Sequence, residues 1–154
     1  MIYTDLTERA MLLAYRAHEG QLDKAGIPYI FHPYHLAEQM HTEAAVCVAL
    51  LHDVVEDSAV TIEEIATAFP PEIAEAVRLL THDKETPYLD YIRTLRTNPL
   101  ARKVKLADLV HNSDESRLRD AVANEPALVR KRRAKYEAAQ AILLEKNAES
   151  EESQ

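Results

Sequence analysis

The sequence predicts a single all-α domain, a bundle of about seven to nine helices that occupies residues 1–146. Only two of the 154 residues are glycine, which argues against a turn-rich β-fold. Apolar residues recur at helical spacing through most of the chain, and threonines and prolines stand where helices would begin. A chain of this length is expected to form one hydrophobic core, and no repeat or linker divides it.

The first helix is expected over residues 6–17. Thr4 or Asp5 is available as its N-cap, and Gly20 follows it as a stop signal. The apolar positions of this segment have the spacing of one helix face, and they are Leu6, Ala10, Leu13, Ala14 and Ala17.

A loop and a second helix come next. Residues 21–32 contain a glycine and a proline and show no sustained period, which predicts a loop. Pro33 can then occupy the first turn of a helix that runs to about Met40. His32 is therefore expected at the entrance of this helix.

The segment from residue 44 to residue 55 is apolar on every face apart from His52 and Asp53, which predicts a helix at the centre of the bundle. If this helix continues for another turn, His52 lies beside Glu56, and Asp53 lies beside Asp57. Polar groups would then converge on one side of a buried helix.

Five further helices are expected in the rest of the chain. Thr61 and Glu64 resemble a capping box, and prolines can open the helices that follow. The apolar face of the last helix is expected to hold Leu128, Ala134, Ala138, Ala141 and Leu144. The five helices are expected over residues 61–69, 71–80, 87–96, 100–111 and 125–146. Residues 147–154 are too polar to bury, and we expect them to form a disordered acidic tail.

Composition limits the partners of this chain. The formal net charge of −8 argues against general attraction to nucleic acid or to an anionic membrane surface, because both require a basic face. Cys47 is the only cysteine, so an intramolecular disulfide is impossible, and we interpret it as a small buried side chain. No apolar run approaches the length of a membrane span, and the N-terminus lacks a leader pattern. A cytoplasmic protein is expected.

Buried polar residues give the first indication of chemistry. A carboxylate at Asp53 in so apolar a segment costs several kcal/mol unless it is paired, protonated or bound to a metal. Asp108 lies in a second apolar run, where an ion pair with Lys105 or Arg102 is an alternative to metal binding. His32 is a second histidine candidate, although taken alone a histidine at this place is more often a capping or surface residue.

Two imidazoles and two carboxylates would suit manganese, iron or zinc better than calcium or magnesium, which prefer oxygen ligands. The neighbouring pair His82 and Asp83 could imitate a second metal motif, but it stands in a polar stretch that we interpret as an exposed turn.

Three blocks of sequence are similar to those of a known family. Residues 18–33, HEGQLDKAGIPYIFHP, match H-x-G-Q-x-R-K-x-G-x-P-Y-x-x-H-P, and residues 49–57, ALLHDVVED, match A-L-L-H-D-x-x-E-D. Residues 105–112, KLADLVHN, match K-L-A-D-x-x-H-N. The chain thus resembles the hydrolase domain of the RelA/SpoT family, in the form of the small stand-alone alarmone hydrolases of the HD superfamily. The resemblance covers roughly residues 6–140 and implies an HD-type helical bundle.

The resemblance also implies a site and a reaction. The metal, usually Mn²⁺ in this family, would be held by His32, His52, Asp53 and Asp108. Glu56 and Asp57 match the acidic pair that helps to activate the attacking water. The positions implied to bind the substrate are Lys24, Tyr29, Lys105 and Asn112. The family removes the 3′-pyrophosphate from guanosine tetra- or pentaphosphate to give GDP or GTP.

Two departures from the family concern the substrate. Asp23 stands where the family has an arginine that packs against the purine, and residues 113–116 are more acidic than the family pattern. Other cations would have to compensate, and Arg93, Arg102 and Arg117 are the candidates. Alternative hypotheses are a phosphatase for another phosphorylated nucleotide such as NADPH, and a sensor that binds a nucleotide without catalysis. The sequence does not indicate the oligomeric state.

Overall fold

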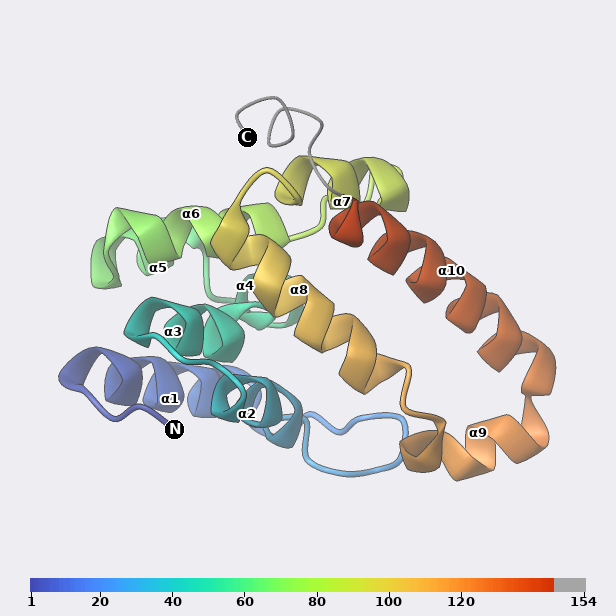
Figure 1. Cartoon of the computed structure of the whole chain (residues 1–154). Coiled ribbons are helices and arrows are strands. Elements are labelled where there is room, and N and C mark those ends of the chain that lie inside the picture. Colours follow the sequence, from blue (N-terminus) through green and yellow to red (C-terminus); the bar gives the residue numbers. More distant parts are fainter. Residues whose placement is uncertain (146–154) are drawn as a thin grey trace.

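The computed structural model describes residues 1–145, which fold as a bundle of α-helices with no β-sheet (Figure 1). The predicted all-α class is therefore confirmed. The predicted tail of residues 147–154 lies outside the described residues, as does Lys146. The helices are α1 (Asp5–Ala17), α2 (Phe31–Glu38), α3 (Glu43–Leu51), α4 (Val54–Asp57), α5 (Ile62–Ala68), α6 (Pro71–Leu80), α7 (Tyr88–Leu95), α8 (Pro99–Asn112), the 3₁₀ helix η1 (Glu115–Leu118), α9 (Arg119–Asn124) and α10 (Pro126–Leu144).

Local signals set most helix starts. Thr4 rather than Asp5 caps α1, because its side chain accepts a hydrogen bond from the Thr7 N–H at 3.2 Å. The predicted capping box of Thr61 and Glu64 opens α5, with both reciprocal hydrogen bonds present. Prolines occupy the first turns of α6, α8 and α10.

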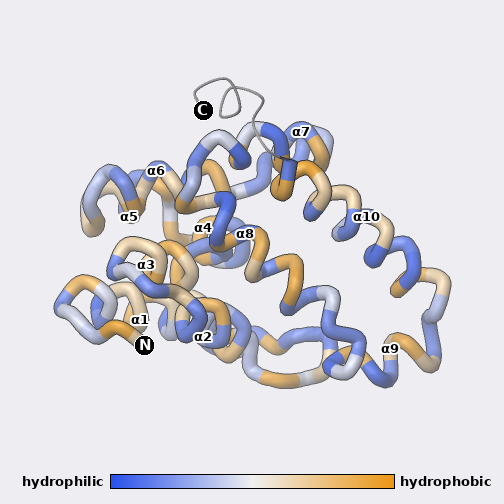
Figure 2. Tube along the Cα trace, viewed as in Figure 1, coloured by the Kyte–Doolittle hydropathy of each residue, from blue (hydrophilic) through white to orange (hydrophobic). Residues whose placement is uncertain are grey.

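Helix α3 forms the centre of the bundle, as predicted. Every side chain from Ala45 to Leu51 is buried, and the helix packs against α1, α2, α6 and α8. Figure 2 shows α3 as an apolar segment enclosed by its neighbours. Burial of a helix on all faces requires this uniform composition, because each face contacts another element rather than water.

The predicted continuous helix over residues 44–55 is wrong at its end. Helix α3 stops at Leu51, and α4 begins at Val54. At the junction Asp53 has φ −105° and ψ −2°, a departure from regular α-helical values, and the His52 side chain bonds back to the Ala49 carbonyl at 2.6 Å. The chain turns here, so Glu56 and Asp57 do not continue the helix that carries His52.

The C-terminal part also differs from expectation. The elements η1 and α9 were not predicted, because residues 113–124 are polar and lack a clear period. Helix α10 buries Val129, Ala139 and Leu143, one position away from the predicted Leu128, Ala138 and Leu144. In α8 the apolar residue Val110 is 61% exposed, whereas its neighbour Leu109 is buried. None of the described helices is long and apolar enough to cross a membrane.

Candidate metal centre and substrate pocket

Four side chains from three places in the sequence meet inside the bundle. His32 comes from the first turn of α2, His52 and Asp53 from the junction of α3 and α4, and Asp108 from α8. One nitrogen or oxygen atom of each lies within 4.8 Å of those of the others. His32, His52 and Asp108 are only 4%, 2% and 3% exposed. The structure thus brings together the four residues that the sequence predicts as metal ligands.

The His52 imidazole is oriented as a ligand would be. Its Nδ1 donates to the Ala49 carbonyl, which leaves Nε2 with the free electron pair. Nε2 is buried without a hydrogen bond among the described residues, 3.0 Å from Asp53 Oδ2 and 3.6 Å from Asp108 Oδ1. Burial opposes a charge on this ring, but the two carboxylates outweigh it and raise the pKa of His52 well above its usual value. The pocket between these atoms favours a positive charge, which a divalent cation would supply.

The second imidazole is held by another histidine. His32 Nε2 lies 2.9 Å from Asp108 Oδ1, and its Nδ1 lies 2.6 Å from His111 Nδ1. The planes of the two rings are within 9° of parallel, with centroids 4.9 Å apart. Burial, the Arg117 cation and neighbouring histidines lower the pKa of His111 to about 4, so a neutral ring can accept the His32 proton. His111 belongs to a matched motif, but sequence reasoning assigned it no role.

Asp108 is held from its other side. Lys105 Nζ donates to Oδ2 at 2.7 Å, and Asn112 Nδ2 donates to Oδ1 at 2.9 Å. Despite burial, Lys105 and the histidines hold the pKa of Asp108 well below its usual range. Of the two cations considered from the sequence, Lys105 is the partner, whereas Arg102 donates to the Leu143 carbonyl at 2.5 Å. The predicted substrate contacts Lys105 and Asn112 therefore both touch a candidate ligand.

Tyr29, which precedes α2, and Glu56, which lies in α4, both interact with Asp53. The Tyr29 hydroxyl donates to Asp53 Oδ2, and burial together with the Asp53 charge raises the pKa of Tyr29. Glu56 Oε1 accepts a hydrogen bond from the backbone N–H of His82. Loss of solvation, reinforced by Asp53, raises the pKa of Glu56 above its ordinary value. A carboxylate with a raised pKa is better suited to accept a proton near neutral pH.

Asp57 is the second member of the acidic pair, and partial burial followed by the Asp53 charge raises its pKa.

The segment of His82 and Asp83 lies outside the four-residue cluster. His82 Nε2 is 2.7 Å from the Thr86 carbonyl, within the polar connection between α6 and α7. The interpretation as a turn agrees with this geometry.

A cavity of about 230 Å³ adjoins the centre at His32. Lys24 and Arg132 line it, and residues 1–145 provide neither with a carboxylate partner. Partial burial and the charges of Arg132 and Lys135 lower the pKa of Lys24, which shows that like charges gather at this wall. The remaining lining residues are Leu22, Asp23, Tyr29, His32, Asn112, Arg117, Leu118 and Tyr136.

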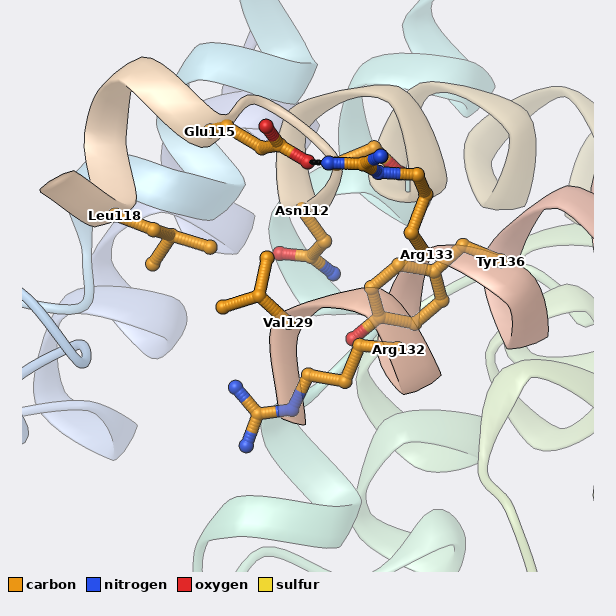
Figure 3. A pocket seen from close by; sticks show the side chains of 8 residues that line it. Asn112, Glu115, Leu118, Val129, Arg132, Arg133 and Tyr136 are labelled. Atoms are coloured by element: carbon orange, nitrogen blue, oxygen red, sulfur yellow. Dashed lines mark hydrogen bonds and ion pairs between the residues drawn. The ribbon is translucent and has the colours of Figure 1, made fainter. Parts of the chain in front are cut away.

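Figure 3 shows the neighbouring part of this region, where η1 faces α10. Arg133 turns toward Glu115, whereas Arg132 points to the other side, away from that ion pair. Arg132 and Tyr136 were missed by sequence reasoning. The cluster of basic residues around Arg132 is visible in the sequence. Only the fold shows that this part of α10 lines the same cavity as Lys24.

The acidic departures from the family pattern are held by local contacts. Asp23 Oδ1 accepts from the N–H groups of Ala25 and Ile27 at 2.8 and 3.0 Å, and its Oδ2 lies 3.4 Å from Arg117 Nη2. Asp114 accepts from Ser116 in η1. Of the three arginines considered as compensating cations, Arg117 lines the cavity, Arg93 pairs with Asp90 on α7, and Arg102 binds α10.

Comparison with known proteins places these observations in a family. The model of the HD domain matches residues 10–103. The enzyme MESH1 of Homo sapiens, a guanosine-3′,5′-bis(diphosphate) 3′-pyrophosphohydrolase, is 36% identical over 124 residues, which cover 69% of each chain. A GTP pyrophosphokinase of Myxococcus xanthus is 38% identical over 77 residues, 47% of this chain. The chain spans only 10% of that protein and 16% of the related rsh protein of Brucella melitensis.

The fold has a similar solved counterpart. The structure of a metazoan SpoT orthologue, described as hydrolysing ppGpp and acting in starvation responses, aligns with a TM-score of 0.71. The alignment covers 96% of this chain and 90% of the other at 25% identity. The likeness extends beyond the residues that the family model matches, to the C-terminal helices that form the cavity wall.

Proposed function

Because this chain belongs to the HD-domain family and, within it, to the hydrolases of RelA/SpoT type, we propose that it removes the 3′-pyrophosphate of guanosine tetra- or pentaphosphate. The products would be pyrophosphate and GDP or GTP. One observation carries the proposal: the four-residue cluster opens at His32 onto a cavity whose wall holds Lys24 and Arg132, two cations without a carboxylate partner among residues 1–145. The name of the human relative specifies the same reaction. We assign this function to one domain over residues 1–146.

The cofactor of this proposal is a divalent metal ion, with Mn²⁺ as the first choice. His32, His52, Asp53 and Asp108 would hold it, because two imidazoles and two carboxylates suit such an ion. When bound, the ion supplies Lewis-acid polarisation of the phosphoryl group and lowers the pKa of the attacking water.

The remaining roles fall to side chains of the chain itself. Glu56, fixed by the His82 N–H, would accept a proton from the attacking water, with Asp57 as the second acidic group. Lys24 and Arg132 would balance the phosphate charge, and Asn112 and Tyr29 would contact the nucleotide from the cavity wall. Lys105 would act mainly by holding Asp108 in place.

The test is a substrate panel. Purified protein with Mn²⁺ is incubated with guanosine tetraphosphate, NADPH and nucleoside monophosphates, and the release of pyrophosphate and of orthophosphate is followed separately. We expect pyrophosphate from guanosine tetraphosphate. The exposed Arg93→Gln variant should match the native protein, because the partner of Arg93 among residues 1–145 is Asp90 on α7, away from the cavity.

Two other results would overturn parts of the proposal. Orthophosphate without pyrophosphate would contradict the alarmone assignment and favour a phosphatase for another nucleotide, such as NADPH. Metal binding without turnover of any substrate would contradict the enzyme and favour a nucleotide-binding sensor.

A further inference from the structure

His18 is a buried histidine to which the proposed reaction gives no task. It follows α1 as its C-terminal cap and is only 2% exposed. Neither the metal cluster nor the cavity includes it. A polar side chain so deeply buried is normally retained in a well-defined hydrogen-bond arrangement.

Gln21 fixes the tautomer of His18. The amide nitrogen of Gln21 donates to two carbonyls, that of Asp57 at 2.6 Å and that of Ala17 at 3.3 Å. The reversed amide would place oxygen against these oxygens, so Gln21 Oε1 must face His18 Nδ1, 2.8 Å away. His18 Nδ1 therefore carries the proton and donates it to Gln21.

The Gln21 side chain that accepts from His18 also binds Asp57, one member of the acidic pair. By its amide, Gln21 joins the end of α1 to the backbone of Asp57, which is 36 positions away in the sequence. Its backbone is held as well, because its N–H donates to the His18 carbonyl at 3.0 Å and its carbonyl accepts from the Tyr29 N–H at 2.8 Å. His18 thus fixes the side chain that fixes the end of α4.

A second contact of His18 leads to the metal cluster. Its ring lies against the ring of Tyr29, with centroids 4.9 Å apart and planes at 58°. The Tyr29 hydroxyl in turn donates to Asp53 Oδ2. The ring contact therefore limits the position of a side chain that orients a candidate metal ligand.

We infer that His18 is a positioning residue with two separate arms: its Nδ1–H holds Asp57 through Gln21, and its ring holds Asp53 through Tyr29. The first arm serves water activation and rests on the proposed function. The second arm serves metal affinity and holds whether or not the proposed substrate is correct.

Two substitutions separate the arms. His18→Phe keeps a ring beside Tyr29 and loses the donor to Gln21, whereas His18→Asn keeps an N–H donor and loses the ring. We expect His18→Phe to lower kcat about tenfold with the Mn²⁺ dissociation constant within about twofold, and His18→Asn to weaken Mn²⁺ binding about tenfold with a smaller change in kcat at saturating metal. Metal affinity is measured by calorimetry with Mn²⁺ alone, and folding by the melting temperature.

A double variant tests the link through Gln21. Gln21→Leu removes the amide, so adding His18→Phe to it should leave kcat no lower than in Gln21→Leu alone. The control is His41→Phe, which changes an exposed histidine in the connection before α3 and should alter none of these quantities.

Three outcomes would overturn the inference: multiplicative loss of kcat in the double variant, parallel loss of kcat and metal affinity in both single variants, or no effect of either. If the native protein hydrolyses none of the substrates, the proposed function fails, and the Mn²⁺ affinities of His18→Asn and His18→Phe still decide the second arm.

Discussion

Asp108 is the side chain on which most contacts of the candidate metal centre converge. Its two oxygens meet His32, Lys105 and Asn112 within 2.9 Å, and the side chain is almost wholly buried. Lys105 donates to Oδ2, whereas His32, His52 and Asn112 lie at Oδ1. Such outer contacts orient a ligand and set its charge.

The roles of Asp108 and Glu56 can be separated by nearly isosteric substitutions. Asp108→Asn should abolish Mn²⁺ binding and hydrolysis together, because a candidate ligand loses its charge. Glu56→Gln should leave Mn²⁺ affinity unchanged and depress kcat, because only a proton acceptor is lost. Calorimetry gives the affinity, and the initial rate of pyrophosphate release gives kcat. Equal loss of metal in both variants would show that the roles are wrongly assigned.

His111 is predicted to act on the metal through His32. His111→Phe removes the acceptor of the His32 Nδ1–H, and we expect Mn²⁺ affinity to fall by about 10- to 100-fold. The exposed His41→Phe serves again as the control. An unchanged affinity would mean that the hydrogen bond between the two rings does not contribute to metal binding.

At the scale of elements, capping residues and apolar spacing carried most of the predictive information. Thr61 with Glu64 gave the start of α5, and the uniform apolarity of residues 44–51 gave the central helix. These signals did not predict where α3 ends, because helical periodicity continues past Leu51 in the sequence. The turn at His52 and Asp53 depends on side-chain contacts with α2 and α8, which are tertiary interactions.

The face of α10 shows a second limit of periodicity. Apolar residues stand next to each other at Leu143 and Leu144, and either could belong to the buried stripe. In the structure Leu143 is fully buried and Leu144 is 62% exposed, because α10 packs on α7 and α8 through the stripe that contains Leu143. Contacts with the neighbouring helices thus determine how α10 is rotated about its axis and which of its faces is buried.

Matched substitutions test this rotation. Leu143→Ala should lower the free energy of unfolding by about 2–5 kcal/mol, since it opens a cavity in the core. Leu144→Ala should change it by less than about 0.5 kcal/mol, since its side chain is largely in water. Urea unfolding followed by circular dichroism measures both. A larger loss for Leu144→Ala would place the other face of α10 against the bundle.

Cys47 reports on the packing of α3. The thiol is fully buried, and burial followed by the Glu43 charge raises its pKa to about 12. The thiolate is the reactive form, so the native protein should resist iodoacetamide at pH 8 and react only after unfolding in urea. Mass spectrometry counts the modified chains. Rapid labelling without urea would contradict a tightly enclosed α3.

The whole molecule is acidic, yet its cavity carries local positive charge. The chain has a net charge of −8, while Lys24 and Arg132 meet at one wall from segments more than 100 positions apart. The four candidate ligands could be predicted from the sequence, because histidines and carboxylates stand out in apolar runs. The sequence could not predict that Arg132 on α10 lines a cavity with Lys24, or that Arg117 in η1 pairs with Asp23, because both depend on the tertiary fold.

Metal binding is expected to raise the free energy of unfolding of the whole domain. The candidate ligands join α2, the junction of α3 and α4, and α8, so unfolding would separate them and release the ion. At a free Mn²⁺ concentration of about 100 times the dissociation constant, the free energy of unfolding should rise by about 2.7 kcal/mol. Urea unfolding with Mn²⁺ or with excess EDTA measures the difference, and Asp108→Asn should show none. If calorimetry detects Mn²⁺ binding to the native protein but the unfolding curves coincide, the unfolded chain binds the ion equally well, which contradicts a site that only the fold assembles.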